Sequence, residues 1–325
     1  MKKFDLILYN GEEILDLRIK LLCHKIDYFV IVEFDRTFQC KKKPYLFDIN
    51  KYKQYKKKII HRKYRLPKYL YNKSPWLIES YQRNSLINNL NIKHTDMIIL
   101  SDVDEIIKPS KLIFNYNQIS RYELLNLRFF GNYLNFTAPY WPVPLSTSFN
   151  VAQDIGLEAL RASYRGLKAD ISYEIYRQYL KNRKQKLINN AGWHFSSLKD
   201  SKLSVAETVQ KKLKDYSHKE YKNKVIMNTN LISFRIRHGL DVNGHYHVWG
   251  TLSQKIIGNK LVNNWIKEKK LFYKKKIYLM KPNYKNIFPY PSRFMKKLIF
   301  LINSSIYYLF YIEYFFNKII RIFKN

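Results

Sequence analysis

The sequence is poor in cysteine and in acidic residues, and it contains no internal repeat. With 2 cysteines among 325 residues, Cys23 and Cys40, the chain has no disulfide framework. Reduced thiols fit a cytosolic protein better than a secreted one. The run from Phe4 to Tyr9 already predicts a strand, which leaves no room ahead of it for a signal peptide. We therefore expect a cytoplasmic protein.

Asp and Glu number 25 against 59 Lys and Arg, which gives a formal net charge of +34. Part of this charge reflects coding bias, because Lys, Asn, Ile and Tyr are all abundant and all have AT-rich codons. At 46% apolar residues the chain is globular and long enough to bury a sizeable core. Because carboxylates are scarce, a cluster of them is informative.

Such a cluster ends the stretch 97–105, Met-Ile-Ile-Leu-Ser-Asp-Val-Asp-Glu. The four apolar residues predict a strand buried on both faces, and Asp102, Asp104 and Glu105 follow it at once. Ligands of open α/β sheets collect at the carboxyl ends of strands. At that position the two carboxylates of an Asp-x-Asp motif could bind Mn²⁺ or Mg²⁺. The bound metal could in turn bind the phosphates of a nucleotide. An acidic loop that caps the next helix is the alternative interpretation.

The rest of the chain divides into three parts. Residues 1–108 alternate predicted strands and helices, which is typical of a doubly wound nucleotide-binding half. Residues 109–250 open with a predicted strand pair around Gly131-Asn132, and we expect them to form one domain with residues 1–108. Residues 251–325 form a basic helical tail.

The tail holds 16 Lys or Arg against 2 acidic residues, Glu268 and Glu313. Within it, Leu298 to Phe316 is an apolar, Tyr-rich run with basic residues on both sides. Because Glu313 interrupts the run, a helix lying in the plane of an anionic membrane surface is favoured over a membrane span. A helix packed on its own domain is the alternative.

Several motifs resemble those of glycosyltransferase family 17, and they occur in the same order between residues 4 and 245. Ser101–Ile106 resembles the metal-site motif of that family. The other matching segments are Tyr9–Glu12, Leu15–Arg18, Asp27–Glu33, Thr37-Phe38, Tyr81–Asn84, Gly192–Ser196 and Ser217–Glu220. The chain departs from the family at Gly11, where Glu usually follows Asn, and at Ile107, where Pro usually follows the metal motif.

The resemblance implies a GT-A-like nucleotide-sugar-binding fold, an α/β fold with a mixed, mostly parallel central sheet. It also implies a metal-dependent, inverting glycosyltransferase that transfers N-acetylglucosamine from UDP-GlcNAc to a glycan or lipid-linked oligosaccharide. We expect the enzyme on the inner face of the membrane, held there by its tail. Its expected partners are a UDP-sugar, the acceptor and anionic lipid, without nucleic acid.

The same resemblance makes residues 1–250 a glycosyltransferase domain with 109–250 as its acceptor half, and it points to candidate site residues. The expected ligands of Mn²⁺ or Mg²⁺ are Asp102, Asp104 and His218. The expected donor-binding residues are Asn10, Glu33, Arg83, Asp102, Trp193 and His194. Glu33, at the end of the second predicted strand, would accept from a ribose hydroxyl, with an exposed loop acid as the alternative. Arg83 would bind phosphate, with a structural arginine paired with Glu33 or Asp102 as the alternative. For the carboxylate that takes the proton of the acceptor hydroxyl, sequence spacing does not choose among Glu105, Asp154, Glu158, Glu220 and Asp241.

Two other functions fit parts of the sequence. A charge of +34 would give strong, salt-dependent affinity for nucleic acid, but no recognition motif is present. The carboxylates of residues 102–105 would also suit a metal-dependent phosphodiesterase, but such sites usually need a second cluster of His and Asp. The glycosyltransferase is therefore the leading hypothesis.

Overall fold

The computed structural model describes most of the first 268 residues. The described residues are 1–116, 118–128, 133–135, 140–162, 184–196, 198, 203–215, 227–237, 242, 249–251 and 258–268. The apolar run of the predicted tail lies outside these residues, as do His218, Glu220 and Asp241. Within these ranges, no helix combines the length and the apolar character needed to cross a membrane.

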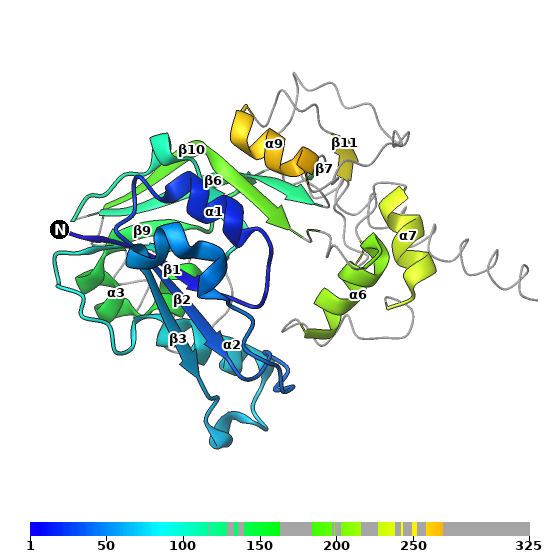
Figure 1. The fold of residues 1–325 in the computed structure, drawn as a ribbon, viewed down its shortest axis with the longest axis horizontal. Helices are drawn as coiled ribbons and strands as arrows, with labels where there is room; N and C mark the ends of the chain where they lie inside the picture. Colours follow the sequence, from blue (N-terminus) through cyan, green and yellow to red (C-terminus); the bar gives the residue numbers. More distant parts are fainter. Residues whose placement is uncertain are drawn as a thin grey trace, which may run out of the picture.

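The first 100 residues form a parallel α/β unit (Figure 1). Its elements are β1 (Lys3–Leu8), α1 (Leu15–Leu22), β2 (Tyr28–Phe34), η1 (Ile49–Lys58), β3 (Ile59–Tyr64), η2 (Lys68–Leu70), α2 (Pro75–Asn84), η3 (Ser85–Ile87) and β4 (Met97–Leu100). The four strands lie in the order β3-β2-β1-β4, and all neighbours are parallel. β4 is buried along its whole length. The predicted alternation of parallel strands and helices is therefore present.

The sheet continues with mainly antiparallel pairs. The further elements are β5 (Glu105–Ile107), η4 (Pro109–Lys111), β6 (Gln118–Arg128), β7 (Tyr133–Asn135), β8 (Tyr140–Trp141), β9 (Leu145–Ser148), α3 (Phe149–Ile155), α4 (Leu157–Ala162), β10 (Lys184–Ser196), α6 (Val205–Asp215), α7 (Thr229–Arg237), β11 (Trp249–Thr251) and α9 (Lys260–Glu268). β9 pairs antiparallel with β4 and β6, and β6 pairs antiparallel with β7. β10 joins β6 in parallel and β5 antiparallel. The result is one mixed sheet, which confirms the predicted fold class.

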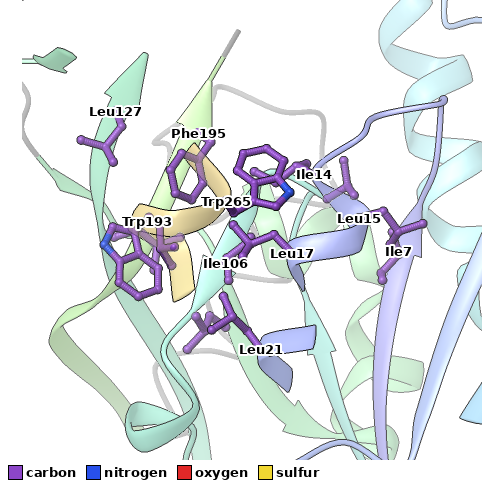
Figure 2. Packing of buried hydrophobic residues seen from close by; sticks show 14 of the residues in the cluster. Ile7, Ile14, Leu15, Leu17, Leu21, Ile106, Leu127, Trp193, Phe195 and Trp265 are labelled. Carbon is purple, nitrogen blue, oxygen red and sulfur yellow. The ribbon is translucent and has the colours of Figure 1, made fainter. Parts of the chain in front are cut away.

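Helices cover both faces of the sheet, because successive side chains of each strand point to opposite faces. On β1, Leu6 packs in the core beneath α2, α3 and α4, whereas Ile7 packs in the core beneath α1. The core beneath α1 also includes residues of α9, where Trp265 (Figure 2) and Ile266 are buried. Helix α9 falls within the expected tail and packs on α1. The boundary expected at residue 250 stays a prediction.

Candidate functional site

One buried arginine holds the loop that follows β4. Arg18 of α1 pairs with Asp5 of β1 at 2.5 Å between Nη2 and Oδ1, and both side chains are fully buried. Arg18 Nη1 donates to the carbonyl oxygens of Asp102 at 2.7 Å and Glu105 at 3.0 Å, and Nη2 donates to Ser101 Oγ at 2.6 Å. Since a buried guanidinium must satisfy its donors within the protein, this arrangement fixes the backbone of the carboxylate loop.

Asp102 and Glu105 are both neutralised by arginines. Arg83 Nη1 donates to Asp102 Oδ1 at 2.8 Å, and Arg161 Nη2 donates to Asp102 Oδ2 at 2.5 Å and to Glu105 Oε1 at 2.7 Å. Glu105 is fully buried and also accepts from the Asp102 N–H at 2.8 Å and from Trp141 Nε1 at 2.6 Å. Burial would raise the pKa of Glu105, but the charge and the hydrogen bond of Arg161, together with the charge of His194, lower that pKa.

Arg83, expected to bind the donor diphosphate, is surrounded by carboxylates. Besides Asp102 it donates to Glu79 at 2.7 Å, one helical turn earlier, and to Glu158 at 2.5 Å. Burial alone would lower the pKa of Arg83, but the three carboxylates raise it well above its ordinary value. Arg83 and Glu158, two sequence candidates with different expected roles, are therefore ion-pair partners.

Asp104 contacts a different set of side chains. Its Oδ1 lies 3.9 Å from His194 Nε2 on β10, and its Oδ2 lies 3.8 Å from Lys212 Nζ on α6. Burial raises the pKa of Asp104, although the charges of Lys212 and His194 oppose the shift. Tertiary structure thus brings the predicted metal ligand together with the predicted donor-binding histidine.

Glu12 also belongs to this site, although it is not among the residues predicted from the sequence. Gly11, with φ at +90°, turns the chain after β1, and the Glu12 carboxylate then accepts from the Asn10 N–H at 2.8 Å. Burial, with a contribution from the charge of Asp104, raises the pKa of Glu12 to about 6. The available signal was an acidic residue placed just past the carboxyl end of a parallel strand. The candidate in this turn was Asn10, whose backbone supports Glu12.

Trp193 and His194 are neighbours on β10, but they point to opposite faces of the sheet. His194 stacks on Trp141 with ring centroids 4.8 Å apart, and burial lowers the pKa of His194. Trp193 is fully buried in the apolar core and does not line the site (Figure 2). The preceding Gly192 is needed for a close approach between strands, since a Cβ there would lie 2.0 Å from the Ile106 carbonyl oxygen.

Glu33, expected to bind the ribose, is fully buried and has internal partners on both oxygens. Oε1 accepts from the Leu46 N–H at 2.5 Å, and Oε2 accepts from the Phe47 N–H at 3.1 Å and lies 2.9 Å from His61 Nε2. Burial would raise the pKa of Glu33, but these hydrogen bonds lower it. In this arrangement Glu33 fastens the segment after β2, and contact with a ribose stays a prediction.

The described part of the chain contains no group of three or more His, Cys, Asp and Glu side chains able to hold a metal ion. Both oxygens of Asp102 are already paired with arginines. Asp104 and Glu12 offer the oxygen ligands that Mn²⁺ and Mg²⁺ prefer, with the His194 imidazole beside them. The oxygen atoms near Asp104 are therefore of the type that binds a hard cation. The described residues provide too few of them to complete its coordination.

The sequence matches the profile of Glycosyltransferase family 17 over residues 1–247. This range includes the carboxylate loop after β4, the end of β10 and helix α6, so it covers the whole site described above. The chain belongs to glycosyltransferase family 17. The resemblance seen in the motifs is thereby confirmed, and the protein is an enzyme of the glycosyltransferase class.

No curated protein shows a significant match to this family 17 glycosyltransferase. Among solved structures, residues 1–349 of TarS from S. aureus align with 13% identity and a TM-score of 0.33, over 73% of this chain and 72% of that one. The same TarS segment in complex with UDP aligns with 11% identity and a TM-score of 0.31, over the same shares. These similarities are remote, and the family match alone identifies the chain.

Proposed function

We propose that this enzyme transfers N-acetylglucosamine from UDP-GlcNAc to a sugar hydroxyl of a glycan or lipid-linked oligosaccharide, with inversion and with the help of Mn²⁺ or Mg²⁺. The family supports sugar transfer. The observation that carries the rest is the convergence of Asp104, Glu12, His194 and Lys212 at the carboxyl edge of the sheet. This is where ligands of open α/β sheets bind.

Transfer with inversion makes two demands on these residues. Negative charge develops on the leaving diphosphate, and the acceptor hydroxyl must lose a proton, by analogy with glycoside hydrolysis. A metal ion held at Asp104 would supply Lewis-acid neutralisation of the diphosphate. Lys212, with its Nζ 3.8 Å from Asp104, adds a second positive charge for the same purpose. His194 is assigned to the donor side of the site.

Glu12 is the carboxylate that we assign as the general base. Its pKa of about 6 makes it ionised at neutral pH yet more basic than an ordinary glutamate, as general-base catalysis requires. Glu105 is fully buried beneath Arg161 and Trp141, and Glu158 is paired with Arg83. Glu105 therefore has no access to an acceptor, and Glu158 is already engaged as a counter-ion of Arg83.

We further propose that the acceptor is carried by a lipid. A lipid-linked acceptor on the inner face of the membrane would agree with the basic tail, whose apolar run is bracketed by lysines and arginine. We propose this location on composition and charge alone.

The test is transfer by the full-length protein from UDP-GlcNAc to a panel of soluble sugar acceptors, with and without added Mn²⁺. Asp104→Asn should lose at least about 100-fold in rate, because it removes the charge expected to hold the metal. Asp215→Asn is the matched control, since it removes the same charge from a surface pair with Lys41. If Asp104→Asn in the presence of chelator works as well as the wild type does with Mn²⁺, the metal proposal is wrong.

A further inference from the structure

The segment that joins β3 to α2 is basic and has exposed aromatic residues. Residues 62–77, called here the β3–α2 tip, contain five Lys or Arg and no Asp or Glu. All five basic side chains are exposed: Arg62, Lys63, Arg65, Lys68 and Lys73. Among them, Tyr69 is 67% exposed, Trp76 is 40% exposed and Leu77 is 47% exposed. Three large apolar side chains within nine positions thus face solvent amid positive charge.

This exposure is built into the fold. Leu66 and Leu70 are buried in the core, and the Leu66 N–H donates to Asp35 Oδ1 at 2.9 Å. The Tyr71 ring lies under the guanidinium of Arg36, 3.9 Å from centroid to Cζ. Ser74 caps α2 by accepting from the Leu77 N–H at 3.3 Å. Because Leu66 and Leu70 are held in the core, the side chains of Lys68 and Tyr69 between them are directed to solvent.

The tip lies at the same edge of the sheet as the candidate site. β3 and β4 are parallel members of the order β3-β2-β1-β4, so the tip and the carboxylate loop both follow carboxyl ends of strands. Three strand spacings separate the two strands, which is about 14 Å. In Figure 1 the segment after β3 projects beyond the end of that strand.

We propose that the β3–α2 tip docks this enzyme on an anionic lipid surface, with Tyr69, Trp76 and Leu77 at the headgroup level and the five basic side chains against the phosphates. Tyr and Trp have an apolar ring with a polar group and favour the membrane–water interface. Each basic residue near such a surface strengthens binding about fivefold. Stacked bases of nucleic acid are the competing partner, but they are usually bound in a basic groove, whereas this surface projects.

Docking in this way would turn the carboxyl edge of the sheet, with Asp104, toward the membrane. That consequence rests on the proposed sugar transfer, because it would present the site to a lipid-linked acceptor. The docking itself does not depend on sugar transfer, so a failed transfer assay would not contradict it.

The test uses full-length protein and vesicles of phosphatidylcholine, alone or mixed equally with phosphatidylglycerol. The double variant Lys68→Gln/Lys73→Gln should pellet with the anionic vesicles about 25-fold less strongly than the wild type. The matched control is Lys25→Gln/Lys93→Gln, which removes the same charge from exposed positions just before β2 and β4, at the opposite edge of the sheet. The control should lose less than about threefold.

A second measurement separates the tip from the tail. Brominated lipid should quench the emission of the wild type, and Trp76→Phe should lose most of that quenching while still binding the vesicles. Equal losses in the two double variants, or unchanged quenching in Trp76→Phe, would overturn the proposal. Vesicle binding kept by the Lys68→Gln/Lys73→Gln variant, together with lost binding to single-stranded RNA, would overturn it in favour of nucleic acid.

Discussion

Arg83 and Asp102, 19 residues apart in the sequence, form an ion pair of 2.8 Å between Nη1 and Oδ1 at the carboxyl edge of the sheet. The Arg83 side chain is only 4% exposed, so the pair is shielded from water on one side. The sequence predicts phosphate binding for Arg83 and metal binding for Asp102, with a structural ion pair to Asp102 as one alternative for Arg83. A diphosphate bound at Arg83 would have to compete with Asp102, and the two roles are therefore coupled.

Removing Arg161 should destabilise the fold strongly. Arg161→Ala leaves the carboxylate of Glu105 buried without its counter-ion, which typically costs about 3–5 kcal/mol. Urea denaturation of the variant would measure this loss. The double variant Arg161→Met/Glu105→Gln should recover a large part of it, because no buried charge then lacks a partner. A double variant as unstable as the single one would show that the lost packing of Arg161, and not its charge, is decisive.

Glu12→Gln should stabilise the protein at high pH and slow the reaction. The folded-state pKa of Glu12 is raised from 4.5 to about 6, so folding favours the protonated form. Stability is therefore lost as the pH rises through this window, by up to about 2 kcal/mol. The variant should be more stable than the wild type near pH 8 and equal to it near pH 4. Urea denaturation across this range checks the sign, with the exposed Glu268→Gln as control.

Substitutions of Trp193 and His194 should have different effects, the first on stability and the second on the use of the donor. Trp193→Leu removes a fully buried ring and should cost about 3 kcal/mol, with donor affinity unchanged in the folded protein. His194→Ala should weaken the use of UDP-GlcNAc at least tenfold, because the ring lies beside Asp104, and it should cost less stability than Trp193→Leu because the His194 side chain is 12% exposed. Thermal unfolding and the KM for the donor distinguish the two. A His194→Ala protein that melts early with normal donor binding would make His194 a core residue.

The sequence by itself determined the strands and helices of the first, parallel half and the position of the carboxylate loop. Met97 to Leu100 could be recognised because four consecutive apolar residues require burial on both faces, and the structure buries all of them. The pairing of the strands on either side of Gly131-Asn132 was likewise predicted from the local sequence, and it is confirmed by β6 and β7, which pair at Leu127–Leu134 and Arg128–Tyr133. The family motifs added the class of enzyme, which the profile match confirms.

Tertiary structure alone decided which charges meet. Arg161 comes 56 residues after Glu105 in the sequence, and no local pattern indicates that it neutralises both Glu105 and Asp102. Glu12 acquires its raised pKa from burial and from Asp104, both of which depend on β1 and β4 being neighbours in the sheet. Apolar periodicity is read within one element, but Coulomb energy depends on distances between elements, and only the folded chain sets those distances.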